Sequence, residues 1–156
     1  TAPQRAIYEV VLRSQLAGIA AAKPRVRYDV MHEAARRVLT EGLVDLGLLP
    51  RGLEDSLAMH HYREFYMHGT GHWLGMDVHD VGLYTKNGEP RKLEAGMCFT
   101  IEPGFYVQPG YKETPSEFRD IGIRIEDDIL VTANGYDNLT INAPKEGAEI
   151  ESLRGA

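Results

Sequence analysis

The chain has 156 residues, of which 43% are hydrophobic, a composition typical of one globular domain that excludes a disordered or fibrous protein. Its 23 acidic residues exceed its 17 basic ones, and the net charge of −6 argues against nucleic acid or an anionic membrane as a partner. A single cysteine, the lack of any apolar run of roughly 18 residues and an N-terminus unlike a signal peptide predict a cytoplasmic protein that crosses no membrane.

Two amphipathic helices are predicted at the start of the chain. The first spans residues 1 to about 22, because Thr1 can cap it, Pro3 suits its first turn and apolar residues recur near helical spacing. The second begins after the capping candidate Asp29 and ends near residue 48, in the stretch LGLLPRG. Each helix should cover a core with its apolar side.

Strands joined by turns are predicted from about residue 66 onward, where short runs are rich in glycine, β-branched and aromatic residues. In GMCFTIEPG the alternation of side chains places Thr100 and Glu102 on one face of a strand. In DIGIRIEDDILVT it places Arg124 and Glu126 together, opposite a row of isoleucines. The stretch TANGYDN predicts a turn, and KEGAEIESLRGA predicts a short helix or a frayed tail.

The stretch MHGTGHWLGMDVHDVG contains three of the six histidines of the chain. His68 and His72 are four residues apart, but the glycines around them argue against a helix, and Gly69 stands where the helical zinc-protease motif requires glutamate. A single histidine is more often a hydrogen-bonded, partly buried side chain than a ligand. Three of them among glycines that let the backbone approach a ligand favour metal ligands or general bases.

Glu102 and Glu126 do not fit the pattern of ordinary solvated carboxylates. Each ends or interrupts an apolar strand, and Glu126 shares a face with Arg124, so an ion pair or a metal ion must compensate its charge. Two carboxylates and a histidine suit a divalent ion such as manganese, cobalt or zinc. The sequence lacks a phosphate-binding loop, a cysteine cluster and a Gly-x-Ser-x-Gly nucleophile turn.

Three motifs, HGTGHWLGMDVHDVG, LEAGMCFTIEPGFYV and DIGIRIEDDILVT, together resemble a known family. In this order and at these separations they look like the catalytic domain of bacterial aminopeptidase P, the Xaa-Pro aminopeptidases of the creatinase, prolidase and methionine aminopeptidase superfamily. The resemblance covers nearly the whole chain. It implies the α+β pita-bread fold, in which a strongly curved antiparallel sheet flanked by helices holds two metal ions.

The resemblance also implies a set of metal ligands. His72 and Glu102 match ligands of the family, and Glu126 matches the glutamate that bridges both ions. Manganese is the usual metal of the family, with cobalt and zinc as alternatives, and it agrees with the oxygen-rich ligand set.

Other residues match groups that act on the substrate. His68 and His79 match histidines that contact the substrate and the developing tetrahedral intermediate, and Tyr106 matches a tyrosine near the site. Arg124 matches an arginine that orients the ligands. Glu102 is the candidate for the group that takes the proton of the attacking water and passes it to the leaving nitrogen.

The activity implied is metal-dependent hydrolysis of the bond between an N-terminal residue and a following proline. Its partners would be peptides with proline in the second position, and relatives often form homo-oligomers. Prolidase, which cleaves dipeptides ending in proline, is the closest alternative. A non-catalytic binding module with the pita-bread fold is the alternative from another class.

The sequence departs from the family in one respect. The family's site also needs two aspartates from a β-hairpin that precedes the region matched here, and neither Asp29, Asp77 nor Asp80 is a convincing substitute. We therefore expect residues 1–156 to be the C-terminal part of a catalytic domain, inactive alone. The chain would then be either a cloned C-terminal piece or the product of a cut whose N-terminal partner stays bound or has been lost.

Overall fold

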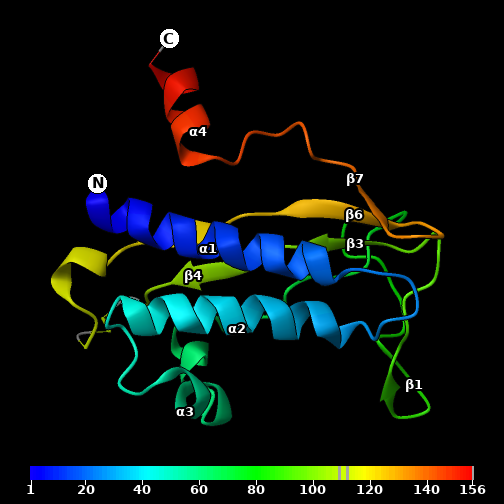
Figure 1. Cartoon of the computed structure of the whole chain (residues 1–156), viewed down its shortest axis with the longest axis horizontal. Helices are drawn as coiled ribbons and strands as arrows, with labels where there is room; N and C mark the ends of the chain where they lie inside the picture. The colour runs from blue at the N-terminus through cyan, green and yellow to red at the C-terminus, as the bar shows by residue number, and fades with distance from the viewer. Residues whose placement is uncertain (109, 112, 156) are drawn as a thin grey trace.

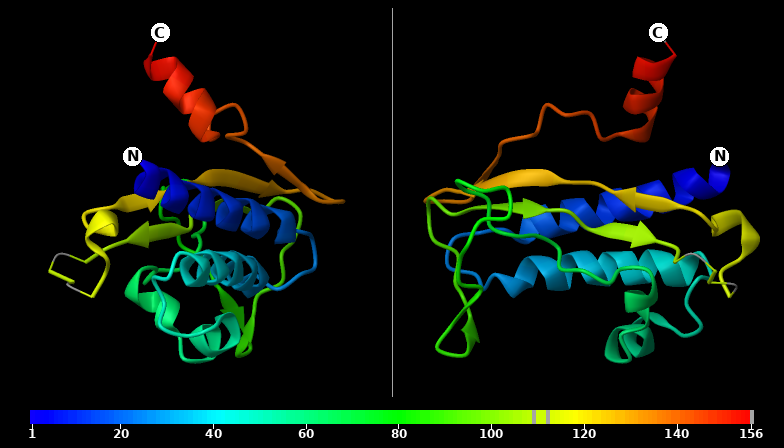
Figure 2. Two further views of the ribbon diagram at one scale, coloured as in Figure 1. Left: turned by 60° about the vertical axis from the view of Figure 1, so that its left-hand side comes forward. Right: turned by 180° about the vertical axis from the view of Figure 1, so that it is seen from behind.

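The computed structural model describes residues 1–108, 110–111 and 113–155. Two long helices, α1 (Ala2–Ala21) and α2 (Asp29–Asp45), run side by side (Figure 1). Short strands lie against one side of this helix pair, as the view from behind in Figure 2 shows. Within the described part of the chain, no helix combines the length and the apolar character needed to cross a membrane.

The prediction for the first helix is confirmed. Thr1 is the N-cap of α1, its amino group lies 3.0 Å from the Oε1 atom of Gln4, and Pro3 lies in the first turn. Apolar positions at helical spacing face inward, among them Ile7, Val11 and Ile19.

The second helix differs from its prediction at both ends. Tyr28, not Asp29, is the N-cap of α2, because the Asp29 carboxylate accepts a hydrogen bond from Arg27 Nε at 3.0 Å and does not cap the helix. The helix ends at Asp45, before the predicted residue 48. Gly47 adopts a φ of +69°, and backbone bonds close the helix there in the way glycine typically allows.

The strands of the described residues form three small antiparallel sheets. The first has the order β3–β6–β7, the second pairs β4 with β5, and the third is the hairpin β1–β2. Their bounds are β1 Thr85–Lys86, β2 Glu89–Pro90, β3 Cys98–Ile101, β4 Gly104–Tyr106, β5 Gly122–Arg124, β6 Asp127–Val131 and β7 Tyr136–Asn138. The predicted turn in TANGYDN connects β6 to β7.

The alternation predicted for residues 120–132 is confirmed. Ile121 and Ile125 are buried, whereas Gly122, Arg124 and Glu126 are exposed. What the pattern did not reveal is that the stretch divides into two strands, β5 and β6, which belong to different sheets.

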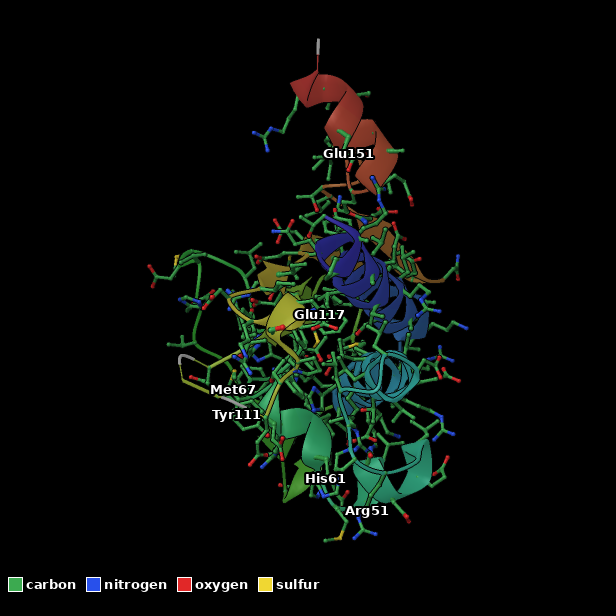
Figure 3. The ribbon with its side chains drawn as sticks, turned by 90° about the vertical axis from the view of Figure 1, so that its left-hand side faces the viewer. Arg51, His61, Met67, Tyr111, Glu117 and Glu151 are labelled. Atoms are coloured by element: carbon green, nitrogen blue, oxygen red, sulfur yellow. The ribbon has the colours of Figure 1, made fainter. Side chains whose placement is uncertain are left out.

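The remaining helices are short: α3 (Leu53–Ala58), the 3₁₀ turns η1 (His61–Glu64) and η2 (Ser116–Phe118), and α4 (Gly147–Arg154). The predicted C-terminal helix is confirmed as α4, and residue 156 lies outside the described residues. Figure 3 is a view almost along α1 and α2. It shows Glu151 on α4, well away from the strands that pack on these two helices. An exposed ion pair joins Glu151 to Arg5 of α1.

The core lies between the helix pair and the strands, in two clusters. One lies beneath β4 and β5, and the other beneath β3 and β6. The first includes Val11, Leu39, Phe65, Phe105 and Ile125; the second includes Ile19, Met31, Trp73, Phe99 and Ile129. Burial of such side chains contributes most of the stability, and it fixes both pairs of strands on one helical layer.

Candidate metal centre

Glu102 and Glu126 face each other across two neighbouring chain segments. β3 pairs with β6 and β4 pairs with β5 in one continuous register, so Glu102 lies opposite Glu126. Both glutamates lie between the paired strands, where the regular ladder is interrupted. Pro103 follows Glu102 and has no N–H to donate, which favours an interruption at this point. The two carboxylates thus come from the same gap in the sheet.

His72 reaches this gap from a segment that runs along β3. Residues 70–74 form no regular strand, yet the Thr100 N–H donates to the His72 carbonyl at 2.9 Å. A Cβ atom on Gly71 would lie 1.8 Å from the Thr100 carbonyl oxygen, so only glycine allows this approach. The glycine backbone was predicted to come close to a ligand; at Gly71 it comes close to β3 instead, because the segment packs as an extra edge of the sheet.

The three predicted ligands meet in space. One donor atom from each of His72, Glu102 and Glu126 can be chosen so that all lie within 4.8 Å of one another. The shortest of these separations that involves the ring is 3.2 Å, between His72 Nε2 and Glu102 Oε1.

The orientation of the His72 ring suits metal binding. Its Nδ1 atom lies 3.0 Å from the carbonyl oxygen of Trp73. Because a carbonyl oxygen can only accept a hydrogen bond, Nδ1 carries the hydrogen. In the neutral ring the lone pair of Nε2 then faces the two carboxylates, as in ligating histidines.

The charges of Glu102 and Glu126 favour the binding of a cation. Glu102 is only 8% exposed, and its Oε2 atom lies 3.5 Å from Arg124 Nη1. Partial burial of its carboxyl, followed by the negative charges of Glu102 and Asp128, raises the pKa of Glu126. One arginine beside two acidic groups leaves negative charge uncompensated, and a divalent ion between the carboxylates would relieve it.

A second group of polar side chains adjoins the first. The Tyr106 hydroxyl accepts a hydrogen bond from Arg124 Nε at 2.7 Å and lies 3.1 Å from His68 Nε2. His68 Nδ1 lies 2.7 Å from the Gly69 carbonyl oxygen, which again assigns the hydrogen to Nδ1. The hydroxyl can therefore donate to Nε2, and this connects His68 to the arginine beside Glu102.

His79 completes the set of predicted residues. Its ring centroid lies 4.3 Å from that of His72, although the residue is exposed. The fold therefore brings together all the site residues that were predicted from the sequence. Their individual roles stay predictions.

Three residues that were not predicted as site residues, Thr100, His32 and Thr70, support the site. Thr100 donates to Glu102 Oε1 at 2.9 Å, and His32 Nδ1 lies 2.8 Å from the hydroxyl of Thr70. Thr100 could have been found, because it shares a strand face with Glu102. His32 lies on α2, far along the chain, and no local pattern connects it to the site.

Known proteins resemble this chain closely. Residues 1–133 match metallopeptidase family M24. The Xaa-Pro aminopeptidase of Haemophilus influenzae is 45% identical over 151 residues, and that of Escherichia coli is 43% identical over 153 residues. The structure of Pseudomonas aeruginosa aminopeptidase PepP superposes with a TM-score of 0.97 at 48% identity, over 99% of this chain and 35% of that one.

The matches cover this chain almost fully and its relatives in part. They include 97% of this chain but 35% of the Haemophilus protein, and 98% against 34% for the Escherichia protein. The chain thus spans about a third of the length of these relatives. The structural likeness confirms the predicted α+β pita-bread fold, in partial form.

Proposed function

Because this chain belongs to metallopeptidase family M24, as its three motifs predicted, we propose that it forms part of an Xaa-Pro aminopeptidase. The reaction would be hydrolysis of the peptide bond between an N-terminal residue and a following proline. The observation that carries the proposal is the convergence of His72, Glu102 and Glu126 from three separate segments. The names of the relatives point to the same activity.

The residues fit a divalent metal centre. An imidazole with its lone pair facing two carboxylates is a donor set suited to manganese, with cobalt and zinc as alternatives. Three protein donors are few for two ions. We propose that two aspartates from outside residues 1–156 complete the centre, as the resemblance to the family implies.

The placement of the residues supports a role for each of them in this proposal. Two ions, when bound, would lower the pKa of a water and polarise the scissile carbonyl. Glu102, held by Thr100 on one oxygen and near Arg124 on the other, is placed to take the proton of the attacking water and return it to the proline nitrogen. Arg124 keeps its charge beside the carboxylates throughout.

His68, His79 and Tyr106 are proposed to bind the substrate and the developing oxyanion. The Tyr106 hydroxyl lies 3.1 Å from His68 Nε2 and also accepts from Arg124, so the two side chains are held together beside the proposed ligands. The exposed ring of His79 lies beside His72 and is open to a ligand.

The test of the proposed centre is Glu126→Gln in the protein that carries this chain. The amide keeps the size of the side chain but removes its charge, so Mn²⁺ binding and hydrolysis of an Xaa-Pro-Xaa peptide should both be lost. Glu149→Gln on the exposed surface of α4 is the matched control and should leave both unchanged. Unchanged Mn²⁺ binding and hydrolysis in Glu126→Gln would contradict the metal centre, whereas an unmodified protein without hydrolytic activity would favour a non-catalytic binding module.

The substrate range needs its own assay. We expect turnover of longer peptides with proline second, measured by release of the N-terminal residue. Turnover confined to Xaa-Pro dipeptides would identify a prolidase instead. A homo-oligomer and a cytoplasmic location belong to the same proposal and stay predictions.

A further inference from the structure

Thr100 lies between two of the proposed metal ligands. It occupies the middle of β3, is 2% exposed and points toward the same side as Glu102. Its hydroxyl donates to Glu102 Oε1 at 2.9 Å and accepts from the backbone N–H of His72 at 3.0 Å. Its own backbone N–H donates to the His72 carbonyl at 2.9 Å. One residue therefore contacts both ligands.

The direction of these hydrogen bonds is fixed. A hydroxyl has one hydrogen, and the N–H of His72 can only donate, so the hydrogen of Thr100 must point to Glu102. No rotation of the hydroxyl satisfies both partners in another way. The Oε1 atom that it holds is the same atom that lies 3.2 Å from His72 Nε2.

We propose that Thr100 is a positioning residue for the metal centre, which sets the separation between His72 Nε2 and Glu102 Oε1. This inference rests on the proposed function, because it assumes that these atoms bind a metal ion. In the metal-binding form of the pair, in which Nε2 carries no proton, the imidazole lone pair and the carboxylate repel each other until a cation lies between them, so an external constraint is needed to hold both in place. Thr100 supplies it on the carboxylate side, and the carbonyl of Trp73 supplies it on the imidazole side.

Loss of the hydroxyl should release Glu102. Without it, the carboxylate is free to turn toward Arg124, whose Nη1 atom already lies 3.5 Å from Oε2. The N–H of His72 would also lose its acceptor at the edge of β3. Partners that orient ligands commonly change metal affinity by roughly 10- to 100-fold, and we expect an effect of that size here.

The test compares Thr100→Val with Thr100→Ser by Mn²⁺ titration, in a calorimeter, of the metal-free protein that carries this chain together with the two expected aspartates. Valine preserves the shape and removes the hydroxyl, so affinity should fall roughly 10- to 100-fold. Serine keeps the hydroxyl and should retain most of the affinity. Thr114→Val is the matched control, because Thr114 is also 2% exposed but its hydroxyl has no partner among the described residues.

A second readout separates positioning from folding. The thermal midpoint of the metal-free protein should fall modestly in Thr100→Val, because the His72 N–H loses its acceptor, and should stay near that of the unmodified protein in Thr114→Val. Mn²⁺ binding by Thr100→Val, measured well below its thermal midpoint where the variant is folded, should still be weakened, whereas Thr114→Val should bind normally. Lost peptidase activity in Thr100→Val should return at excess Mn²⁺.

Two results would overturn the inference, and they are distinguishable. If the unmodified protein binds Mn²⁺ and Thr100→Val binds it equally well, Thr100 has no positioning role. If the unmodified protein binds no Mn²⁺, the proposed metal centre fails and this inference fails with it.

Discussion

The backbone carbonyls beside His68 and His72 decide what each ring can do. Each ring directs Nδ1 toward a carbonyl oxygen, of Gly69 and of Trp73 respectively, and so keeps Nε2 as the acceptor atom. The partners of Nε2 then differ. The ring of His72 faces Glu102, and the ring of His68 faces the Tyr106 hydroxyl. Two histidines of one motif thereby acquire different chemistry.

Substitution of Gly71 should disrupt the site by displacing the backbone segment that carries His72. In Gly71→Ala the new Cβ would overlap the Thr100 carbonyl oxygen at 1.8 Å, and the segment that carries His72 would have to move away from β3. We expect a loss of about 1–3 kcal/mol in the free energy of unfolding, together with weaker Mn²⁺ binding. Urea denaturation and calorimetry would measure the two effects.

Gly69→Ala is the control for this change. Its added Cβ would meet no atom closer than 4.0 Å, so both quantities should stay near those of the unmodified protein. Equal behaviour of the two alanine variants would refute the close packing of residues 70–74 on β3.

His32 should make the metal-free protein sensitive to acid. Burial, which disfavours the charged ring, lowers the pKa of His32 below its ordinary 6.5. The positive charges of Arg36 and Arg63 lower this pKa further, and the negative charge of Glu33 opposes them. As the pH falls below about 6.5, the unfolded chain takes up a proton that the folded state resists. Stability is therefore retained above this pH and lost below it.

The variant His32→Asn should flatten that dependence, because asparagine can keep a hydrogen bond to Thr70 and does not titrate. Thermal midpoints between about pH 7.5 and 5.5 would show it. His60→Asn is the control: His60 is exposed and has a positive φ that asparagine tolerates. A steep loss of stability in His32→Asn, equal to that of the unmodified protein, would speak against a role for this ring.

At the scale of elements, the interruption between β3 and β4, and between β5 and β6, creates the site. In a continuous ladder the backbone groups of the two strands would be paired regularly, without a gap between them. Here Pro103 and the break in the opposite strand expose Glu102 and Glu126 to a common space. The two pairs of strands on either side stay aligned because each packs on α1 and α2 through its own apolar cluster.

A buried ion pair ties the segment after β7 to this frame. Lys145 Nζ lies 2.8 Å from Oδ1 of Asp127, which is 2% exposed and also bonded by Gln15 and Thr140. Lys145→Met should lower the free energy of unfolding by up to about 3 kcal/mol, because Asp127 would keep only neutral donors for its buried charge. Urea denaturation would measure the loss.

The exposed ion pair of Arg5 with Glu151 is the control for the buried pair of Lys145 with Asp127. Both side chains are more than half exposed, so Arg5→Met should cause no measurable change. If both methionine variants unfold at the same urea concentration, Asp127 does not depend on Lys145.

At the scale of the whole molecule, the number of ligands limits what residues 1–156 can do. A manganese ion takes about six ligands, so His72, Glu102 and Glu126 cannot satisfy two ions. We expect the 156 residues expressed alone to bind Mn²⁺ weakly and to leave Xaa-Pro peptides intact. Addition of a polypeptide that carries the two expected aspartates should restore both. An active, metal-loaded chain without a partner would contradict this.

Several elements of the fold followed from local patterns, although α3 and the β1–β2 hairpin were not predicted. The spacing of apolar residues predicted α1 and α2, and alternation predicted which side chains of β3 and of residues 122–131 share a face. Errors arose where a competing contact decides the outcome. Arg27 holds the carboxylate of Asp29 away from the helix end, and Gly47 closes α2 early.

The sequence by itself determined which side chains could form a site: the histidine motif, Glu102, Arg124 and Glu126 were evident from composition, alternation and family resemblance. Only the tertiary structure decided that Glu102 lies opposite Glu126 and that His72 runs beside β3. The physical reason is that alternation fixes the face of a side chain within one strand but carries no information on pairing register. Register comes from packing of both pairs of strands on the helices, and the approach of His72 comes from the missing side chain of Gly71.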